Sequence, residues 1–312
     1  MDQQDNANIA SSTSFGIASK VKDYFQLMKF TLSFMVVFST VISFLLAPNY
    51  EVVYTRNKLL SVLLLFIGGM LITGSANTIN QILEKDTDAL MKRTASRPIP
   101  SGRMSVSEAT FFAIIAGGLG VFIMWRFFNF QSAMVGLFSL FLYGFIYTPL
   151  KKVNSISVLV GALPGALPCL IGWVAATDAL TGEASYGGWI LFAIQFLWQF
   201  PHFWAIAWVA HKDYSAAGFK LLPSDKGPTK FTALQTVMYS ALMVPVGLLP
   251  HYFNMSGAIS MWIVLACNIF MVLVSINLFI KMDVKSARWV MFSSYFYLMI
   301  VLISLYADKV RV

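Results

Sequence analysis

The chain has 312 residues, of which 58% are hydrophobic and only 12% are charged, and its mean hydropathy is +0.71. These values exclude an ordinary soluble globular protein and indicate an integral membrane protein. The net charge of +8 comes from basic residues clustered in alternate loops, which reflects membrane topology, so no nucleic-acid partner is expected.

Residues 1–23 are polar and rich in Ser, Asn, Gln and Asp, which predicts a disordered cytoplasmic tail and not a cleaved signal peptide. Residues 24–312 are expected to form a single intramembrane domain. Its predicted fold class is all-α, a multi-pass membrane bundle of nine transmembrane helices around a central cavity. The apolar segments long enough to cross about 30 Å of hydrocarbon are 30–47, 59–82, 107–126, 132–148, 156–176, 187–210, 231–250, 256–280 and 289–306.

The basic residues orient this bundle. With the N-terminus inside, 17 of the 22 Lys and Arg residues fall in inner segments and five in outer segments. Because loops rich in Lys and Arg stay on the cytoplasmic side, we expect a cytoplasmic N-terminus and an outer C-terminus.

A charged motif follows the second predicted span. Asn80, Glu84 and Asp88 are spaced by four residues, so on a helix they form one stripe of oxygen ligands. Oxygen ligands suit Mg²⁺, which keeps some waters and takes further ligands from substrate phosphates. The motif predicts a diphosphate site at a membrane surface. Three cations follow at once and can hold the outer oxygens of the same anion: Lys92, Arg93 and Arg97.

Two neighbouring features leave alternatives open. Asp86 points away from the stripe on a regular helix, so a direct ligand role and a solvated position are both possible for it. Tyr147, Lys151 and Lys152 lie on the inner loop between the fourth and fifth spans. For these residues, positive-inside anchoring is favoured over contact with a ligand.

The fifth predicted span is rich in small residues and contains Pro164 and Pro168. Small residues allow close helix contacts, and the two prolines predict a kinked or broken helix. Packing is the favoured role of this segment, and a cavity wall for a bulky ligand is the alternative.

A second motif closes the sixth span and contains His202, Lys212 and Asp213. A lone histidine at such a position is often a hydrogen-bonded core residue, but the nearby Lys212 and Asp213 favour a site residue. On a straight helix Asp213 would lie about 16.5 Å beyond His202. Direct pairing of the two side chains therefore requires the chain to turn around residues 209–212.

Together these motifs resemble the protoheme IX farnesyltransferases (heme O synthases), within the intramembrane aromatic prenyltransferase superfamily. The similarity extends from Tyr24 to the ninth span. The family's Asn-x-x-x-Asp-x-Asp-x-Asp and Met-x-Arg-Thr-x-x-Arg motifs are matched from Asn80 to Arg97. Its Tyr-Thr-x-x-Leu-Lys motif is echoed at 147–152, and its Gly-Ala-x-Pro-Gly-Ala-x-Pro run at 161–168.

Within this resemblance, the second motif indicates which substrate the protein uses. Trp-Gln-Phe-Pro-His at 198–202, followed by Lys-Asp-Tyr at 212–214, separates heme-directed members from quinone-directed relatives, which have an Asp-rich motif there. The chain departs from the family at three places. Glu84 replaces the usual aspartate, Lys-Phe-Thr at 29–31 replaces Lys-Pro-Arg, and Phe-Lys-Leu at 219–221 replaces Ile-Pro-Met.

The resemblance implies a prenyltransferase that moves the farnesyl group of farnesyl diphosphate to a vinyl group of protoheme IX (heme B). Water adds in the same reaction, giving heme O and diphosphate for heme A/O biosynthesis and the terminal oxidases. The expected partners are farnesyl diphosphate, heme B, the lipid bilayer and a downstream heme A synthase. The expected location is the bacterial cytoplasmic (inner) membrane, with the active site on the cytoplasmic side.

The resemblance also implies roles for the motif residues. Mg²⁺ is expected on Asn80, Glu84 and Asp88, with Asp213 as the carboxylate from the second half of the chain. His202 is expected to orient the heme, ligate its iron or take a proton from the attacking water, and these three roles remain open. The expected diphosphate ligands are Lys92, Arg93, Arg97 and Lys212.

Two other functions remain as alternatives. A prenyltransferase of the same fold could act on a quinone precursor such as 4-hydroxybenzoate. A transporter could also use intramembrane acids and broken helices, but its site should lie near mid-membrane. The acids of this chain are expected at the inner rim, beside a cluster of arginines.

Overall fold

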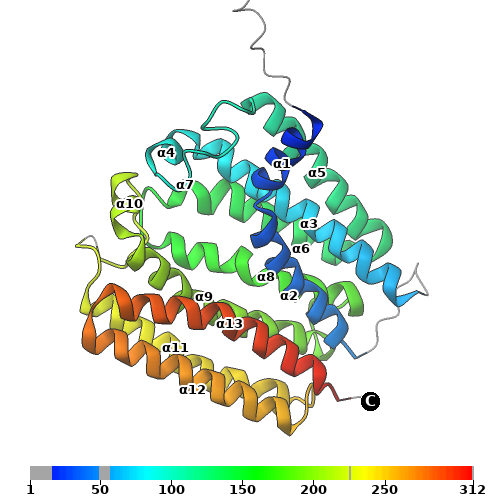
Figure 1. Ribbon diagram of the computed structural model, residues 1–312. Helices are drawn as coiled ribbons and strands as arrows, with labels where there is room; N and C mark the ends of the chain where they lie inside the picture. Colours follow the sequence, from blue (N-terminus) through cyan, green and yellow to red (C-terminus); the bar gives the residue numbers. More distant parts are fainter. Residues whose placement is uncertain (1–15, 49–56, 225, 311–312) are drawn as a thin grey trace, which may run out of the picture.

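A computed structural model describes residues 16–48, 57–224 and 226–310 of the protein (Figure 1). Within these residues the regular structure is helical, apart from an isolated antiparallel bridge between Ser256 and Lys309. The elements are α1 (Ile17–Leu27), α2 (Phe30–Leu46), α3 (Lys58–Leu83), α4 (Lys85–Leu90), α5 (Val106–Phe127), α6 (Phe130–Phe141), the π-helix η1 (Leu142–Tyr147), α7 (Thr148–Leu150), α8 (Ser157–Thr177), the 3₁₀-helix η2 (Glu183–Ser185), α9 (Tyr186–Val209), α10 (His211–Ala216), α11 (Lys230–Tyr252), α12 (Ala258–Lys281) and α13 (Val284–Ala307).

The long helices agree with the predicted spans. In the described part of the chain, eight helices are long and apolar enough to cross a membrane. A ninth crossing results if α1 and α2, which meet at an angle of 55°, count as one bent span. The fourth crossing, Phe130–Leu150, joins α6, η1 and α7 into one segment. The prediction of an all-α membrane bundle is therefore confirmed, with eight or nine crossings.

Helix α1 (Ile17–Leu27) overlaps the end of the segment 1–23, which we expected to be a disordered tail. It begins at Ile17, and residues 1–15 of the predicted tail lie outside the described residues. Two ion pairs hold α1 in place: Lys20 Nζ lies 3.0 Å from Glu108 Oε1 on α5, and Arg103 Nε, in the loop before α5, lies 2.9 Å from Asp23 Oδ1. The ordered chain thus starts before residue 23, because partners far along the sequence fix the polar face of α1.

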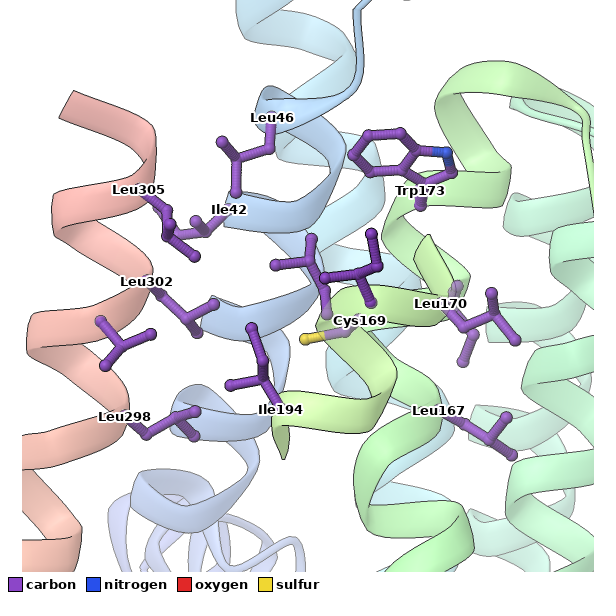
Figure 2. Packing of buried hydrophobic residues seen from close by; sticks show 14 of the residues in the cluster. Ile42, Leu46, Leu167, Cys169, Leu170, Trp173, Ile194, Leu298, Leu302 and Leu305 are labelled. Atoms are coloured by element: carbon purple, nitrogen blue, oxygen red, sulfur yellow. The ribbon is translucent and has the colours of Figure 1, made fainter. Parts of the chain in front are cut away.

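Helix α8 is the centre of the bundle. In its most apolar stretch 78% of the residues are buried, against 28% for α5 and α12. Figure 2 shows α2 between α8 and α13, so that helices from opposite ends of the chain meet in one core. The shared core of these helices and α9 is apolar and contains Ile42, Leu46, Leu167, Leu170, Trp173, Ile194, Leu298, Leu302 and Leu305.

We predicted a kinked or broken helix, and the two prolines do not break α8, which continues from Ser157 to Thr177. Pro168 has no N–H to donate to the carbonyl of Pro164, and this carbonyl instead accepts a hydrogen bond from Ser139 Oγ at 3.2 Å. Gln195 Nε2 donates to the carbonyl of Gly165 at 2.7 Å, and Gln199 Nε2 donates to the carbonyl of Ala162 at 3.0 Å. Side chains from α6 and α9 therefore supply partners to backbone carbonyls around the prolines.

The contact between α8 and α2 depends on a glycine. A Cβ at Gly172 would lie 2.0 Å from the backbone oxygen of Thr40, which cannot rotate away. We expect Gly172→Ala to lower the free energy of unfolding by about 1–3 kcal/mol, the usual cost of overpacking a core. Thermal unfolding of the detergent-solubilised protein measures this loss. Gly118→Ala is the control, since a Cβ there meets nothing within 4 Å, and equal unfolding temperatures would contradict the close contact.

Candidate active site

The three predicted oxygen ligands lie on one buried face at the end of α3. Asn80, Glu84 and Asp88 are 1%, 4% and 1% exposed. Helix α3 ends at Leu83, but Asp88 N–H still donates to the carbonyl of Glu84 at 2.7 Å, so the turn continues into α4. Asp86 is exposed on the opposite side of α4, which agrees with the solvated position that the sequence left open.

Lys29 reaches this face from the break between α1 and α2. Its backbone is left-handed, with a φ of 50°, and its Nζ donates to Asn80 Oδ1 at 2.7 Å. Two α3 side chains hold the break open: Gln81 Nε2 donates to the carbonyl of Leu27 at 2.6 Å, and Asn77 Nδ2 to the carbonyl of Met28 at 3.2 Å.

The end of the fourth crossing supplies a second contact. The π-helix η1 leads into α7, where Thr148 Oγ1 donates to the carbonyl of Tyr143 at 2.8 Å and accepts from Asn80 Nδ2 at 3.2 Å. Lys151 is only 8% exposed, and its Nζ forms an ion pair with Glu84 Oε1. The same ammonium lies 4.9 Å from the ring centre of Tyr147, so α7 turns both a hydroxyl and a cation towards the stripe.

The loop after α4 brings a third cation, Arg97, into contact with the stripe. Arg97 Nη1 lies 2.5 Å from Asp88 Oδ2, and Thr94 Oγ1 donates to the backbone oxygen of Asp88 at 2.7 Å. These two contacts fold the loop back onto α4. Lys92 and Arg93 are exposed beside it.

The second motif meets the first at the same end of the molecule, where Figure 1 draws α4, α7 and α10 together. Helix α9 ends at Val209 and α10 begins at His211, so the chain turns within the interval that the sequence required. The Arg93 guanidinium donates to the Tyr214 hydroxyl at 3.4 Å, and the N–H of Lys220 donates to the carbonyl of Lys151 at 2.8 Å.

The motif's own charged residues stand further out. Lys212 and Asp213 are exposed on α10. Their role as ligands of a metal or a diphosphate therefore remains a prediction, whereas the neighbouring Tyr214 is in direct contact with Arg93.

His202 lies within the helix pair α9 and α13. It is 8% exposed, its ring stacks on Trp198 with centroids 4.7 Å apart, and its Nδ1 lies 2.8 Å from Ser294 Oγ. The Ser294 hydroxyl donates its only proton to the carbonyl of Met291 at 2.6 Å. His202 Nδ1–H must therefore be the donor in the other bond, which leaves the lone pair of Nε2 free. His202 and Asp213 make no direct pair in the described structure.

An apolar pocket leads away from the stripe between α2, α3, α6 and α8. It begins at Asn77 and Tyr143, one turn from Asn80, and extends to Met124 and Ile171. Its cavity volume is about 80 Å³. Such a pocket suits an apolar chain attached to a charged group at the stripe.

The donor set fits a hard divalent cation. The stripe offers one amide oxygen and two carboxylates, all buried, and each is now held by a cation: Asn80 by Lys29, Glu84 by Lys151 and Asp88 by Arg97. Oxygen donors of this kind are the ligands that Mg²⁺ takes, with its other positions filled by water and phosphate. Removing one partner of a buried ion pair costs about 3–5 kcal/mol, so these acids require a positive partner at all times.

Sequence reasoning missed Lys29 and undervalued Lys151. Both were assigned to the positive-inside pattern, yet both are in direct contact with the stripe. The available signal for Lys151 was its place in the Tyr-Thr-x-x-Leu-Lys segment. For Lys29 the signal was the lysine that the chain keeps from the family's Lys-Pro-Arg segment, although its partner Asn80 is 51 residues away.

Comparisons with known proteins identify relatives of this chain. Residues 36–300 match the sequence model of the UbiA prenyltransferase family. A protoheme IX farnesyltransferase from Cytophaga hutchinsonii is 45% identical over 294 residues, which are 94% of this chain and 100% of that protein.

Two solved structures share the fold. One, described as a digeranylgeranylglyceryl phosphate synthase, has a TM-score of 0.76 at 21% identity and covers 93% of this chain and 98% of its own. A UbiA homologue from Archaeoglobus fulgidus, bound to GPP and Mg²⁺, has a TM-score of 0.64 at 16% identity and covers 91% of this chain and 99% of its own. At these identities the likeness establishes the helical fold.

Proposed function

Because the chain belongs to the UbiA prenyltransferase family, we propose that it transfers the farnesyl group of farnesyl diphosphate to protoheme IX, giving heme O. The observation that carries this proposal is the buried stripe of Asn80, Glu84 and Asp88 with a cation on each member. The acceptor follows from the 45% identical protoheme IX farnesyltransferase and from the Trp-Gln-Phe-Pro-His segment at 198–202.

Mg²⁺ is the proposed cofactor, held by Asn80, Glu84 and Asp88, with Asp213 as a further carboxylate from α10. When bound, Mg²⁺ supplies positive charge that stabilises the leaving diphosphate. Support comes from the buried oxygen donors of this chain and from the Mg²⁺ bound with GPP in the homologue from Archaeoglobus fulgidus.

The cations of the inner face are the proposed ligands of the diphosphate. Arg97 and Lys151 already lie at the stripe, and Arg93 is held beside it by Tyr214. The charges of Arg97 and Lys151 favour departure of the diphosphate, because these two side chains are held in a region from which most water is excluded. The exposed Lys92 and Lys212 are proposed to complete this set at its outer edge.

The carbon chemistry needs no nucleophile from the protein. The C–O bond of farnesyl diphosphate breaks and its electron pair leaves with the diphosphate. A heme vinyl group attacks the allylic cation, and the new positive charge lies on the carbon beside the pyrrole ring. Water adds there and loses a proton. The pocket between α2, α3, α6 and α8 is the proposed place of the farnesyl chain, and His202 is proposed to contact the heme or to accept the proton.

The finer topology is part of the same proposal. Counting α1 and α2 as one bent span gives nine crossings, a cytoplasmic N-terminus and an outer C-terminus. The short helices α4, α7 and α10 then lie on the cytoplasmic side of a bacterial inner membrane. This choice is supported by the excess of Lys and Arg in the segments on that side. A heme A synthase is the proposed consumer of the product.

An assay with two acceptors tests this function. Membranes containing the protein are supplied with farnesyl diphosphate and with either heme B or 4-hydroxybenzoate, and products are identified by mass spectrometry. We expect farnesylated and hydrated heme with the first acceptor and no prenylated product with the second. Membranes from cells that lack the protein are the control. A prenylated benzoate without heme O would instead support the quinone-directed alternative.

A further inference from the structure

Each oxygen donor of the stripe is paired with a cation that belongs to the chain. Arg97 lies 2.5 Å from Asp88, Lys151 forms an ion pair with Glu84, and Lys29 donates to Asn80 at 2.7 Å. The two carboxylates thus carry two negative charges that two fixed cations already balance. The side chains of Arg97 and Lys151 are only 15% and 11% exposed, so solvent screens these pairs weakly.

A divalent ion entering alone therefore meets a neutralised site. It would have to move Lys151 and Arg97 from the carboxylates, and both would remain nearby as unpaired positive charges. A diphosphate changes this balance because it supplies anionic oxygens to which the displaced cations can bind. The Lys151 ammonium also lies 4.9 Å and 5.3 Å from the ring centres of Tyr147 and Phe219, so it has cation–π contacts besides its ion pair with Glu84.

We propose that Lys151 and Arg97 occupy the metal ligands until a diphosphate arrives, so that the divalent ion binds only together with the diphosphate. Both cations then pass from Glu84 and Asp88 to the diphosphate, and Lys29 leaves Asn80 in the same exchange. This inference rests on the proposed function, because it concerns the same site. It makes metal binding and diphosphate binding strongly and positively coupled.

The coupling is measured with Mn²⁺ in place of Mg²⁺. Purified full-length protein in detergent is titrated with Mn²⁺ alone, and free Mn²⁺ is followed by electron paramagnetic resonance. The titration is repeated with inorganic pyrophosphate and corrected with a protein-free titration. We expect wild-type protein to bind Mn²⁺ at least about tenfold more tightly when pyrophosphate is present, within the usual range of coupling between sites.

A variant separates this idea from simple metal binding. Lys151→Gln frees Glu84, so it should bind Mn²⁺ alone about tenfold more tightly than wild type and gain less from pyrophosphate. Lys152→Gln is the matched control, because Lys152 is exposed and adjacent in sequence. If Lys151→Gln does not fold, Arg97→Gln carries the same expectation at Asp88.

Two results would overturn the inference: tight Mn²⁺ binding by wild-type protein without pyrophosphate, or no gain in affinity from either variant. The two-acceptor assay on wild-type membranes is independent of both. Heme O formation together with uncoupled Mn²⁺ binding would remove this inference and leave the proposed function intact. Absence of heme O would remove the proposed function itself.

Discussion

Replacing Asp88 by alanine is expected to abolish heme O formation while the protein stays folded and inserted. Asp88 is 1% exposed and is the stripe residue that pairs with Arg97. Its loss removes a metal ligand and leaves Arg97 without its partner. Removing one preorganised group that stabilises developing charge already costs about 10²–10³ in rate, so we expect a loss of at least about 10³-fold.

The measurement is heme O per unit of membrane protein, by mass spectrometry of extracted hemes. Asp88→Asn keeps the size of the side chain and should also be impaired, because it lacks the charge. Asp86→Ala is the control, since Asp86 is exposed two residues away, and it should keep most of the activity. Near-normal heme O formation by Asp88→Ala would contradict the claim that the stripe holds the metal.

Replacing His202 by alanine is expected to damage the use of heme much more than the binding of diphosphate. The ring lies between α9 and α13, stacked on Trp198, and its Nδ1 is held by Ser294. The stripe is built from other elements, so its geometry should survive the change. A positioned acid or base contributes about 10²–10⁴ in rate, and we expect kcat/KM for heme B to fall within that range.

The affinity for pyrophosphate is the second readout for this variant. It should change less than about threefold, because residues that share no contact are only weakly coupled. His251→Ala serves as the control, because His251 lies at the far end of α11 and contacts the backbone of Ser256. Equal losses in heme use and in pyrophosphate binding would count against a role for His202 at the heme.

The sequence predicted the fold well because membrane spans are read from local composition. All nine predicted segments overlap long helices of the structure, and the ends differ by a few residues. The buried stripe was also predictable, since four-residue spacing sets the face of a helix whatever its partners are. Asn80, Glu84 and Asp88 are accordingly buried, whereas Asp86 is exposed.

The remaining features depend on contacts between distant residues. Lys29 meets Asn80 only because Asn77 and Gln81 hold the break between α1 and α2. The prolines of α8 were expected to kink or break the helix. The helix continues, and the side chain of Ser139, 25 residues from Pro164, donates a hydrogen bond to the carbonyl of Pro164. No local pattern reports such partners.

Helix α1 gives a similar lesson. Composition predicted a disordered tail up to residue 23, because Lys20 and Asp23 look like solvated charges in a polar segment. In the structure these two residues bind Glu108 and Arg103, which are 88 and 80 positions away in the sequence. A charged face can therefore be ordered when its counter-charges lie on a neighbouring helix.

The central claim is that Asn80, Glu84 and Asp88 bind the metal of a metal diphosphate. It is tested most directly by a crystal structure grown with Mn²⁺ and a non-reactive farnesyl diphosphate analogue, using the anomalous signal of manganese. We predict one strong peak about 2.1 Å from oxygens of all three side chains, with the diphosphate between the peak and Arg97. A diphosphate bound elsewhere, with these three side chains still paired to Lys29, Lys151 and Arg97, would contradict the account.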